Sequence, residues 1–322
     1  MFSPNYINYW LRGAFLYYNL ELFGEKLKQI RKALSIGQKE IHQITGIEER
    51  TIRRIENAKV LPKLDTLEIL SLIYKEDLVS LLIQCRLDDY STFSKIKNEI
   101  EFKIDNEEQY NLHIEVRMLT KLLSSVENLY YKNLISQLIL FAEAAILYKD
   151  NKNNNNIVAL NKFVEAIKIT NSAFSLDNYD SFVYSSIEIR ILMNIAFVIN
   201  KLNDKEKYLE IIEFCVNSVD TDDEIYPKLC HNLAGAYRRN KNYTKSLEFS
   251  KLGIKTCQEN RLYNGLSLLY YGRGLSEHYL GESESIDSLS LSVSLCEAFG
   301  QDKLKKTIID NCNKILGIDL KD

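Results

Sequence analysis

The scarcity of helix-breaking residues most constrains how this chain can fold. Only 3 prolines and 12 glycines occur in 322 residues. Proline interrupts a helix and glycine weakens one, so long helices can run unbroken through most of this sequence. Apolar residues recur at about 3.6-residue spacing, and strand-like alternation is hard to find. We therefore predict an all-α protein, and at roughly 100–200 residues per domain its length favours two domains.

Positive charge is concentrated near the start of the chain. The formal net charge is -3, yet ten basic and four acidic residues lie between Lys26 and Lys63. That segment is therefore +6, which leaves about -9 for the rest of the chain. A basic module on an acidic body is typical of a protein that binds an anionic polymer at one end.

The basic segment also has the pattern of a helix-turn-helix. Apolar residues recur at helical spacing on both sides of Gly46, and glycine suits a tight turn. We expect short helices over residues 38–45 and 48–57. Their inward-facing residues are predicted to be Ile41, Ile44, Ile52 and Ile55. In such a motif the second helix enters the major groove of DNA.

The charged residues of this pair of helices are the predicted DNA-binding site. With Ile52 and Ile55 inward, the second helix presents its arginines outward, and arginine is well shaped for bidentate contact with guanine. The candidate DNA-binding residues from this pattern are Gln38, Glu49, Arg50, Arg53 and Arg54. The alternative is that the three arginines are an ordinary solvated helix face.

This segment resembles the phage-repressor-like (Cro/C1 or XRE-type) helix-turn-helix family. The matching residues are Arg31, Gln38, Gly46, Thr51, Ile52, Ile55, Glu56, Asn57 and Lys59. The resemblance implies that Gln38, Asn57 and Lys59 hold phosphates. It also places the base contacts on Glu49, Arg50 and Arg54.

Two residues depart from the family pattern. Gly37 stands where a Ser or Thr helix cap is usual, which is a modest loss because glycine is a tolerable N-cap. Ala58 replaces the usual glycine after the second helix, so the turn at this position is expected to differ.

We divide the chain into residues 1–21 as an N-terminal extension, 22–85 as a five-helix helix-turn-helix domain, and 86–322 as a repeat domain. The boundary follows the end of the basic bias after Cys85. The aromatic start of the chain contains Arg12 and several asparagines and lacks ~18 clean apolar residues, so it is not a convincing membrane span.

The second domain shows internal repeats. Asn194-Ile195-Ala196 matches Asn232-Leu233-Ala234 38 positions later, and Ala234 matches Gly274 40 positions later. Small residues at these positions let paired helices approach closely. We expect a right-handed superhelical solenoid of tetratricopeptide-like helix pairs. The polar run from Lys149 to Asn156 is interpreted as a loop.

The first helix of each pair is expected to line a concave face. Asparagine can hold an extended peptide backbone as donor and acceptor, and a cation can hold a carboxylate. The candidate peptide-binding residues are Arg190, Asn194, Phe197, Lys228, His231, Asn232 and Tyr271. The alternative is that Asn194 and Asn232 are simply tolerated polar residues.

Together the two domains resemble the peptide-pheromone-responsive transcriptional regulators of the Rgg/PlcR type. The resemblance implies a homodimer that binds a double-stranded DNA operator under the control of a short linear signalling peptide. We expect a cytoplasmic protein that is not an enzyme and has no cofactor, metal site, catalytic residues or membrane partner. Two alternatives stay open: a phage-type repressor controlled by a protein partner, and a repeat scaffold that sequesters proteins.

Overall fold

The computed structural model describes residues 18–86, 89–105, 111–126, 128–150, 153–263 and 265–320. These ranges contain sixteen α-helices and no strand, apart from an isolated bridge between Tyr18 and Arg86. The prediction of an all-α protein is confirmed. The chain divides into two compact units, Met1–Glu99 and Ile100–Asp322, which we call unit 1 and unit 2.

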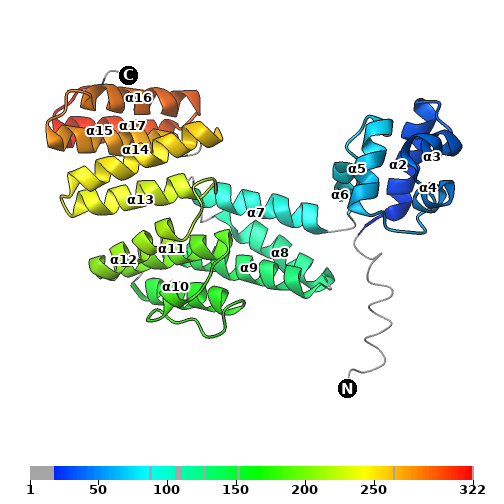
Figure 1. Ribbon diagram of the computed structural model, residues 1–322. Helices are drawn as coiled ribbons and strands as arrows, with labels where there is room; N and C mark the ends of the chain where they lie inside the picture. Colours follow the sequence, from blue (N-terminus) through cyan, green and yellow to red (C-terminus); the bar gives the residue numbers. More distant parts are fainter. Residues whose placement is uncertain are drawn as a thin grey trace. The chain divides into compact units, whose positions relative to one another are not determined.

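Unit 1 contains a small five-helix domain (Figure 1). Its helices are α2 (Leu20–Ala33), α3 (Gln38–Thr45), α4 (Glu49–Glu56), α5 (Leu64–Tyr74) and α6 (Leu78–Gln84). Every one of these helices contributes buried apolar side chains to a single core, in which Phe23, Ile41 and Leu78 are completely enclosed. The start of α2 is tied to the end of α6, because the amide of Asn19 donates to the carbonyl oxygen of Cys85 at 2.7 Å.

The helix-turn-helix has the expected form, with one error. Helix α3 spans the predicted residues, and Gly46 ends it in the left-handed conformation at φ 73°. Ile41, Ile52 and Ile55 are buried as predicted, but the side chain of Ile44 is 59% exposed. Ile44 is rotated about 60° around the helix from Ile41, and a helix of only two turns buries one narrow face.

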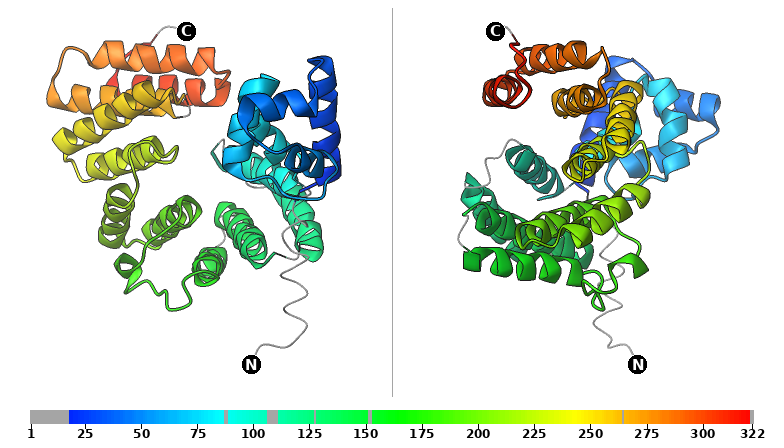
Figure 2. Two further views of the ribbon diagram at one scale, coloured as in Figure 1. Left: turned by 45° about the vertical axis from the view of Figure 1, so that its right-hand side comes forward. Right: turned by 90° about the vertical axis from the view of Figure 1, so that its left-hand side faces the viewer.

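Unit 2 is a stack of helices, and its first residue, Ile100, lies in the second part of α7 (Asp89–Asp105). The remaining helices follow one another in chain order along a curved stack (Figure 2). They are α8 (His113–Ser125), α9 (Leu129–Lys149), α10 (Asn153–Lys168), α11 (Ser186–Lys201), α12 (Lys205–Asn217), α13 (Tyr226–Arg239), α14 (Tyr243–Asn260), α15 (Leu266–Leu280), α16 (Ser285–Ala298) and α17 (Asp302–Asn311).

The helices of unit 2 pack as antiparallel pairs, α9 with α10, α11 with α12, α13 with α14 and α15 with α16. Gly274 allows the last pair to approach closely, because a Cβ atom at this position would lie 2.7 Å from Leu289. This confirms the role predicted for the small residue. Gly281 then ends α15 in the left-handed conformation.

The polar run after α9 is not wholly a loop. Helix α9 includes Lys149 and helix α10 begins at Asn153, so the predicted loop is wrong at Lys149 and from Asn153 to Asn156. Asn156 is buried, with only 8% of its surface exposed. Composition alone favoured a loop, whereas packing of the apolar face of α10 against α9 extends the helix into the asparagine run.

The N-terminal extension lies outside the described residues up to position 17. Helix α2 begins at Leu20 and is capped by Asn19, whose Oδ1 accepts from the amide of Leu22 at 2.9 Å. Across the described ranges, no helix combines the length and apolar character needed to cross a membrane.

Candidate functional site

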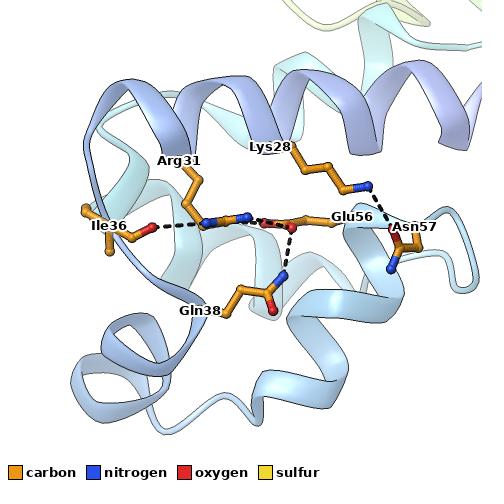
Figure 3. A network of polar contacts seen from close by, with 6 residues as sticks. All are labelled: Lys28, Arg31, Ile36, Gln38, Glu56 and Asn57. Atoms are coloured by element: carbon orange, nitrogen blue, oxygen red, sulfur yellow. Dashed lines mark hydrogen bonds and ion pairs between the residues drawn. The ribbon is translucent and has the colours of Figure 1, made fainter.

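A buried carboxylate holds together the three helices that carry the predicted DNA-binding residues. The side chain of Glu56, at the end of α4, is 1% exposed. Arg31 of α2 donates to it through Nε at 2.6 Å and Nη2 at 3.1 Å, and Gln38 of α3 donates through Nε2 at 2.8 Å (Figure 3). Arg31 also donates to the carbonyl oxygen of Ile36. The hydrogen bond to Glu56 raises the pKa of Arg31 above its ordinary value.

This network changes the part that Gln38 can take in DNA binding. Its amide group points inward to Glu56 (Figure 3). The backbone N–H groups of the first turn of α3 are left by helix geometry without intrahelical acceptors, and such groups favour a phosphate. Gln38 therefore positions the start of α3, and its backbone rather than its Nε2 is suited to the phosphate contact.

Helix α4 presents a cationic face opposite its buried residues. Ile52 and Ile55 are each 1% exposed, whereas Arg50, Arg53 and Arg54 are exposed. Glu49, in the first turn, is partly buried. Arg50 and Arg54 are four residues apart and thus adjacent on the helix surface, so that both guanidinium groups can reach into one groove.

The chain leaves α4 through a left-handed turn. Ala58 has φ 55°, and the amides of Ala58 and Lys59 donate to the carbonyl oxygens of Ile55 and Arg54. These two bonds form a Schellman motif, which usually has glycine at the left-handed position. The expectation of a different turn is therefore wrong, because alanine adopts the glycine conformation there.

The two predicted phosphate-binding residues beyond α4 are exposed. Asn57 accepts through Oδ1 from Nζ of Lys28 at 2.7 Å (Figure 3). Lys59 extends from the turn itself and is also exposed. The structure thus brings the candidate residues of α3, α4 and the following turn onto one small domain.

In unit 2, the predicted residues of α11 already have partners. Nε of Arg190 lies 3.5 Å from Oε1 of Glu101. Asn194 is buried and donates through Nδ2 to the carbonyl oxygen of Arg190 at 2.8 Å. Phe197 is partly buried, with its ring centroid 6.2 Å from that of Tyr208 in α12. The amide nitrogen of Asn194 is therefore already bonded within its own helix.

The predicted residues of α13 touch the helices on either side. Nδ2 of Asn232 lies 3.2 Å from the sulfur of Met193 in α11, a weak acceptor. The neighbouring His231 is partly buried beside the backbone of Leu268 in α15. Burial, followed by the positive charges of Arg238 and Lys228, lowers the pKa of His231 to about 4.

The seven candidates therefore occupy three helices that succeed one another in the stack, α11, α13 and α15. Lys228 is partly buried and lies near the start of α13. Tyr271 is partly buried on α15 and packs against the core formed with α16 and α17. Burial raises the pKa of Tyr271 above its ordinary value, and a hydrogen bond with the side chain of Asn311 in α17 opposes this only in part.

Two residues of the candidate sites escaped the sequence pattern. Gly24 lets α2 approach α4 closely, because a Cβ atom there would lie 2.5 Å from the backbone oxygen of Glu56. Arg238 follows His231 by seven residues and so lies on the same face of α13. That spacing is a signal by which Arg238 could have been found from the sequence.

The fold and these features define a helix-turn-helix domain joined to a stack of tetratricopeptide-like helix pairs. No known family model matches the chain, and no curated protein matches it. Several solved structures match this chain over almost the whole of their own length. PlcR from Bacillus thuringiensis in complex with the peptide PapR7 and DNA has a TM-score of 0.67 and 15% identity, covering 90% of this chain and 99% of PlcR.

Two streptococcal proteins also share this fold. The SHP pheromone receptor Rgg2 from Streptococcus dysgalactiae has a TM-score of 0.53 and 13% identity, covering 90% of this chain and 99% of Rgg2. ComR from S. thermophilus, in complex with DNA and its signalling peptide ComS, has a TM-score of 0.52 and 14% identity, covering 89% of this chain and 97% of ComR. The resemblance to Rgg/PlcR-type regulators is thus confirmed as a shared fold.

Proposed function

We propose that this protein is a sequence-specific, DNA-binding transcriptional regulator whose affinity for its operator is controlled by a short signalling peptide. The observation that carries the proposal is the exposed cationic face of α4. Three arginines project from a helix whose opposite face is buried and whose end is held by the enclosed carboxylate of Glu56. A helix must be held rigidly in this way if the side chains it carries are to select one base over another.

The DNA-binding residues have distinct proposed roles. Arg50 and Arg54 read base edges, with Glu49 available to accept from cytosine. Arg53, Asn57 and Lys59 contact the phosphate backbone together with the first-turn amides of α3 at Gln38. All of these lie in the segment whose net charge is +6 in a chain whose total is -3.

We place the peptide on the face formed by α11, α13 and α15. The solved structures of PlcR and ComR with a bound peptide support a peptide ligand for this fold. The predicted contacts are Arg190, Asn194, Phe197, Lys228, His231, Asn232 and Tyr271. Because Arg190 and Asn194 already bond within the protein, a ligand that binds them must replace these partners.

We also propose that the regulator is a cytoplasmic homodimer that binds two half-sites. One small helix-turn-helix grips little DNA, and two-fold symmetry matches a paired operator. The six cysteines are all free and buried, which suits a reducing compartment.

The test is selection of binding sites from random double-stranded DNA by the full-length protein, with sedimentation of the protein on its own. We expect enrichment of one paired half-site, and a dimer at micromolar concentration. A sequestering scaffold would enrich no sequence, and that result would rule out the proposed function. If the protein enriches one DNA sequence but no peptide changes its affinity for that sequence, the repressor controlled by a protein partner becomes the better explanation.

A further inference from the structure

Arg238, near the end of α13, carries a charge that no carboxylate of the described residues is seen to compensate. Its side chain is partly buried, and Nη1 is fully enclosed without a hydrogen-bond acceptor from the described residues. Burial lowers the pKa of this guanidinium, and the adjacent Arg239 lowers it further. Arginine nevertheless stays protonated in proteins, so a buried positive charge is present.

Three other partly buried arginines of the described chain are paired with carboxylates. Arg31 meets Glu56 at 2.6 Å, Arg273 meets Glu277 at 2.6 Å, and Arg190 meets Glu101 at 3.5 Å. The groups that influence Arg238 electrostatically are Tyr271, Arg239 and Tyr279, and no carboxylate is among them. Since buried charges are almost always paired, the lack of a carboxylate beside Arg238 among the described residues needs an explanation.

The position of Arg238 connects it to the proposed peptide-binding face. It lies two turns after His231 on the same side of α13, and its charge acts on His231. On the α15 side it borders Tyr271 and Gly272. A Cβ atom at Gly272 would lie 3.5 Å from Nη1 of Arg238, an ordinary contact distance, so the guanidinium lies against α15 at this residue.

We infer that Arg238 is the receptor for a carboxylate of the bound peptide. This inference rests on the proposed function and deepens it by naming the ligand group and its anchor. A guanidinium binds a carboxylate through two parallel hydrogen bonds, which Lys228 cannot reproduce with a single ammonium. Because Nη1 of Arg238 is enclosed, the edge formed by Nε and Nη2 is the one that would meet the carboxylate. Arg190, the other candidate, would first have to give up Glu101.

The carboxylate can come from the C-terminus of the peptide or from an Asp or Glu side chain, and the experiment separates the two. The full-length protein is incubated with a randomised short-peptide library carrying free C-termini, and separately with the same library amidated at the C-terminus. Retained peptides are identified by mass spectrometry. They are then resynthesised with each carboxylate neutralised in turn, as the C-terminal amide, Asn or Gln, and their affinities are measured by calorimetry.

We expect neutralisation of one carboxylate to weaken binding to the wild-type protein by roughly tenfold or more, because a charge-assisted pair is lost. Arg238→Gln should cause a similar loss, and in this variant neutralising that carboxylate should have little further effect. Arg239→Gln is the matched control. It removes the same charge at the adjacent, exposed position and should leave the affinity nearly unchanged.

A second measurement separates ligand binding from a structural role. Arg238→Met removes an uncompensated buried charge and should raise the Tm of the unliganded protein while weakening peptide binding. A lower Tm together with unchanged affinity would overturn the inference. So would peptides that bind equally well after every carboxylate has been neutralised. If neither library yields a binder, the proposal that a peptide controls this protein is wrong. That result differs from a failure of the inference about Arg238, in which peptides bind but no carboxylate matters.

Discussion

At the scale of single residues, this protein combines side chains that are held in place with others that project freely. Gln38 and Glu56 are turned inward, whereas the arginines of α4 point to solvent. The resemblance to the Cro/C1 family assigned Gln38 to phosphate, and the structure gives its side chain another partner. The spacing of residues along the chain was thus enough to find the motif. The direction of each side chain depends instead on which residues of neighbouring helices contact one another.

The first residue-scale prediction concerns base recognition. Arg50→Ala and Arg54→Ala should each cost about 1–3 kcal/mol of binding free energy on the selected operator and relax the preference at the contacted base pair. Lys59→Ala should instead weaken binding to all sequences alike and make the salt dependence shallower. Fluorescence anisotropy over a range of salt concentrations checks both effects. Unchanged specific binding in both arginine variants would show that α4 does not read bases.

The second residue-scale prediction concerns the turn after α4. Ala58 holds φ at 55°, where an alanine is strained and a glycine is not. Ala58→Gly should therefore raise the free energy of unfolding by roughly 0.5–1 kcal/mol, after subtraction of the greater entropy that glycine has in the unfolded chain. Urea denaturation measures the change. An equal or lower stability would mean that the backbone at this position is not strained.

At the scale of helices, one enclosed carboxylate connects α2, α3 and α4. Glu56→Ala removes the acceptor for Arg31 and Gln38 and leaves a largely enclosed guanidinium without its partner. We expect a loss of about 3 kcal/mol in stability. Hydrogen exchange of the α2 and α4 amides should speed up, and affinity for the operator should fall with it.

The matched control for Glu56 is Glu40 in α3. Its side chain is exposed, so Glu40→Ala should change stability by no more than about 0.5 kcal/mol. If the two variants unfold alike, the network does not hold the three helices together.

His231 in α13 should make the stability of the protein depend on pH. The pKa of His231 is about 4 in the folded protein and ~6.5 in an unfolded chain, so the unfolded state binds more protons between these values. The contribution of neutral His231 to stability is therefore fully present above pH ~6.5. It is lost progressively as the pH falls toward 4, by at most about 3 kcal/mol.

The measurement is urea denaturation of the wild-type protein and His231→Gln at several pH values. The stability of the wild type should fall more steeply with decreasing pH, and the difference between the two should build up between pH ~6.5 and 4. Parallel curves would mean that His231 titrates normally in the folded state.

At the scale of the whole molecule, the sequence was sufficient to predict the class of fold and the motif. The period of the apolar residues and the spacing around Gly46 depend on local structure, so the bounds of α3 and the close packing at Gly274 were predicted correctly. The sequence did not predict that Ile44 is exposed or that Nη1 of Arg238 lacks a hydrogen-bond acceptor among the described residues. Both depend on what lies opposite a helix face, which is decided by residues distant in sequence.

The proposed regulation requires that a peptide bound to unit 2 alters the affinity of unit 1 for DNA. A peptide can change affinity for DNA only if it prefers one arrangement of the protein, and a coupling of about 1–3 kcal/mol is enough.

The most direct test is anisotropy titration of the selected operator with the full-length protein at one salt concentration, with and without a peptide retained in the library selection. We predict that the peptide shifts the midpoint by roughly 5- to 150-fold, and that Arg238→Gln abolishes the shift at the same peptide concentration. Superimposable curves with the peptide demonstrably bound would contradict the account.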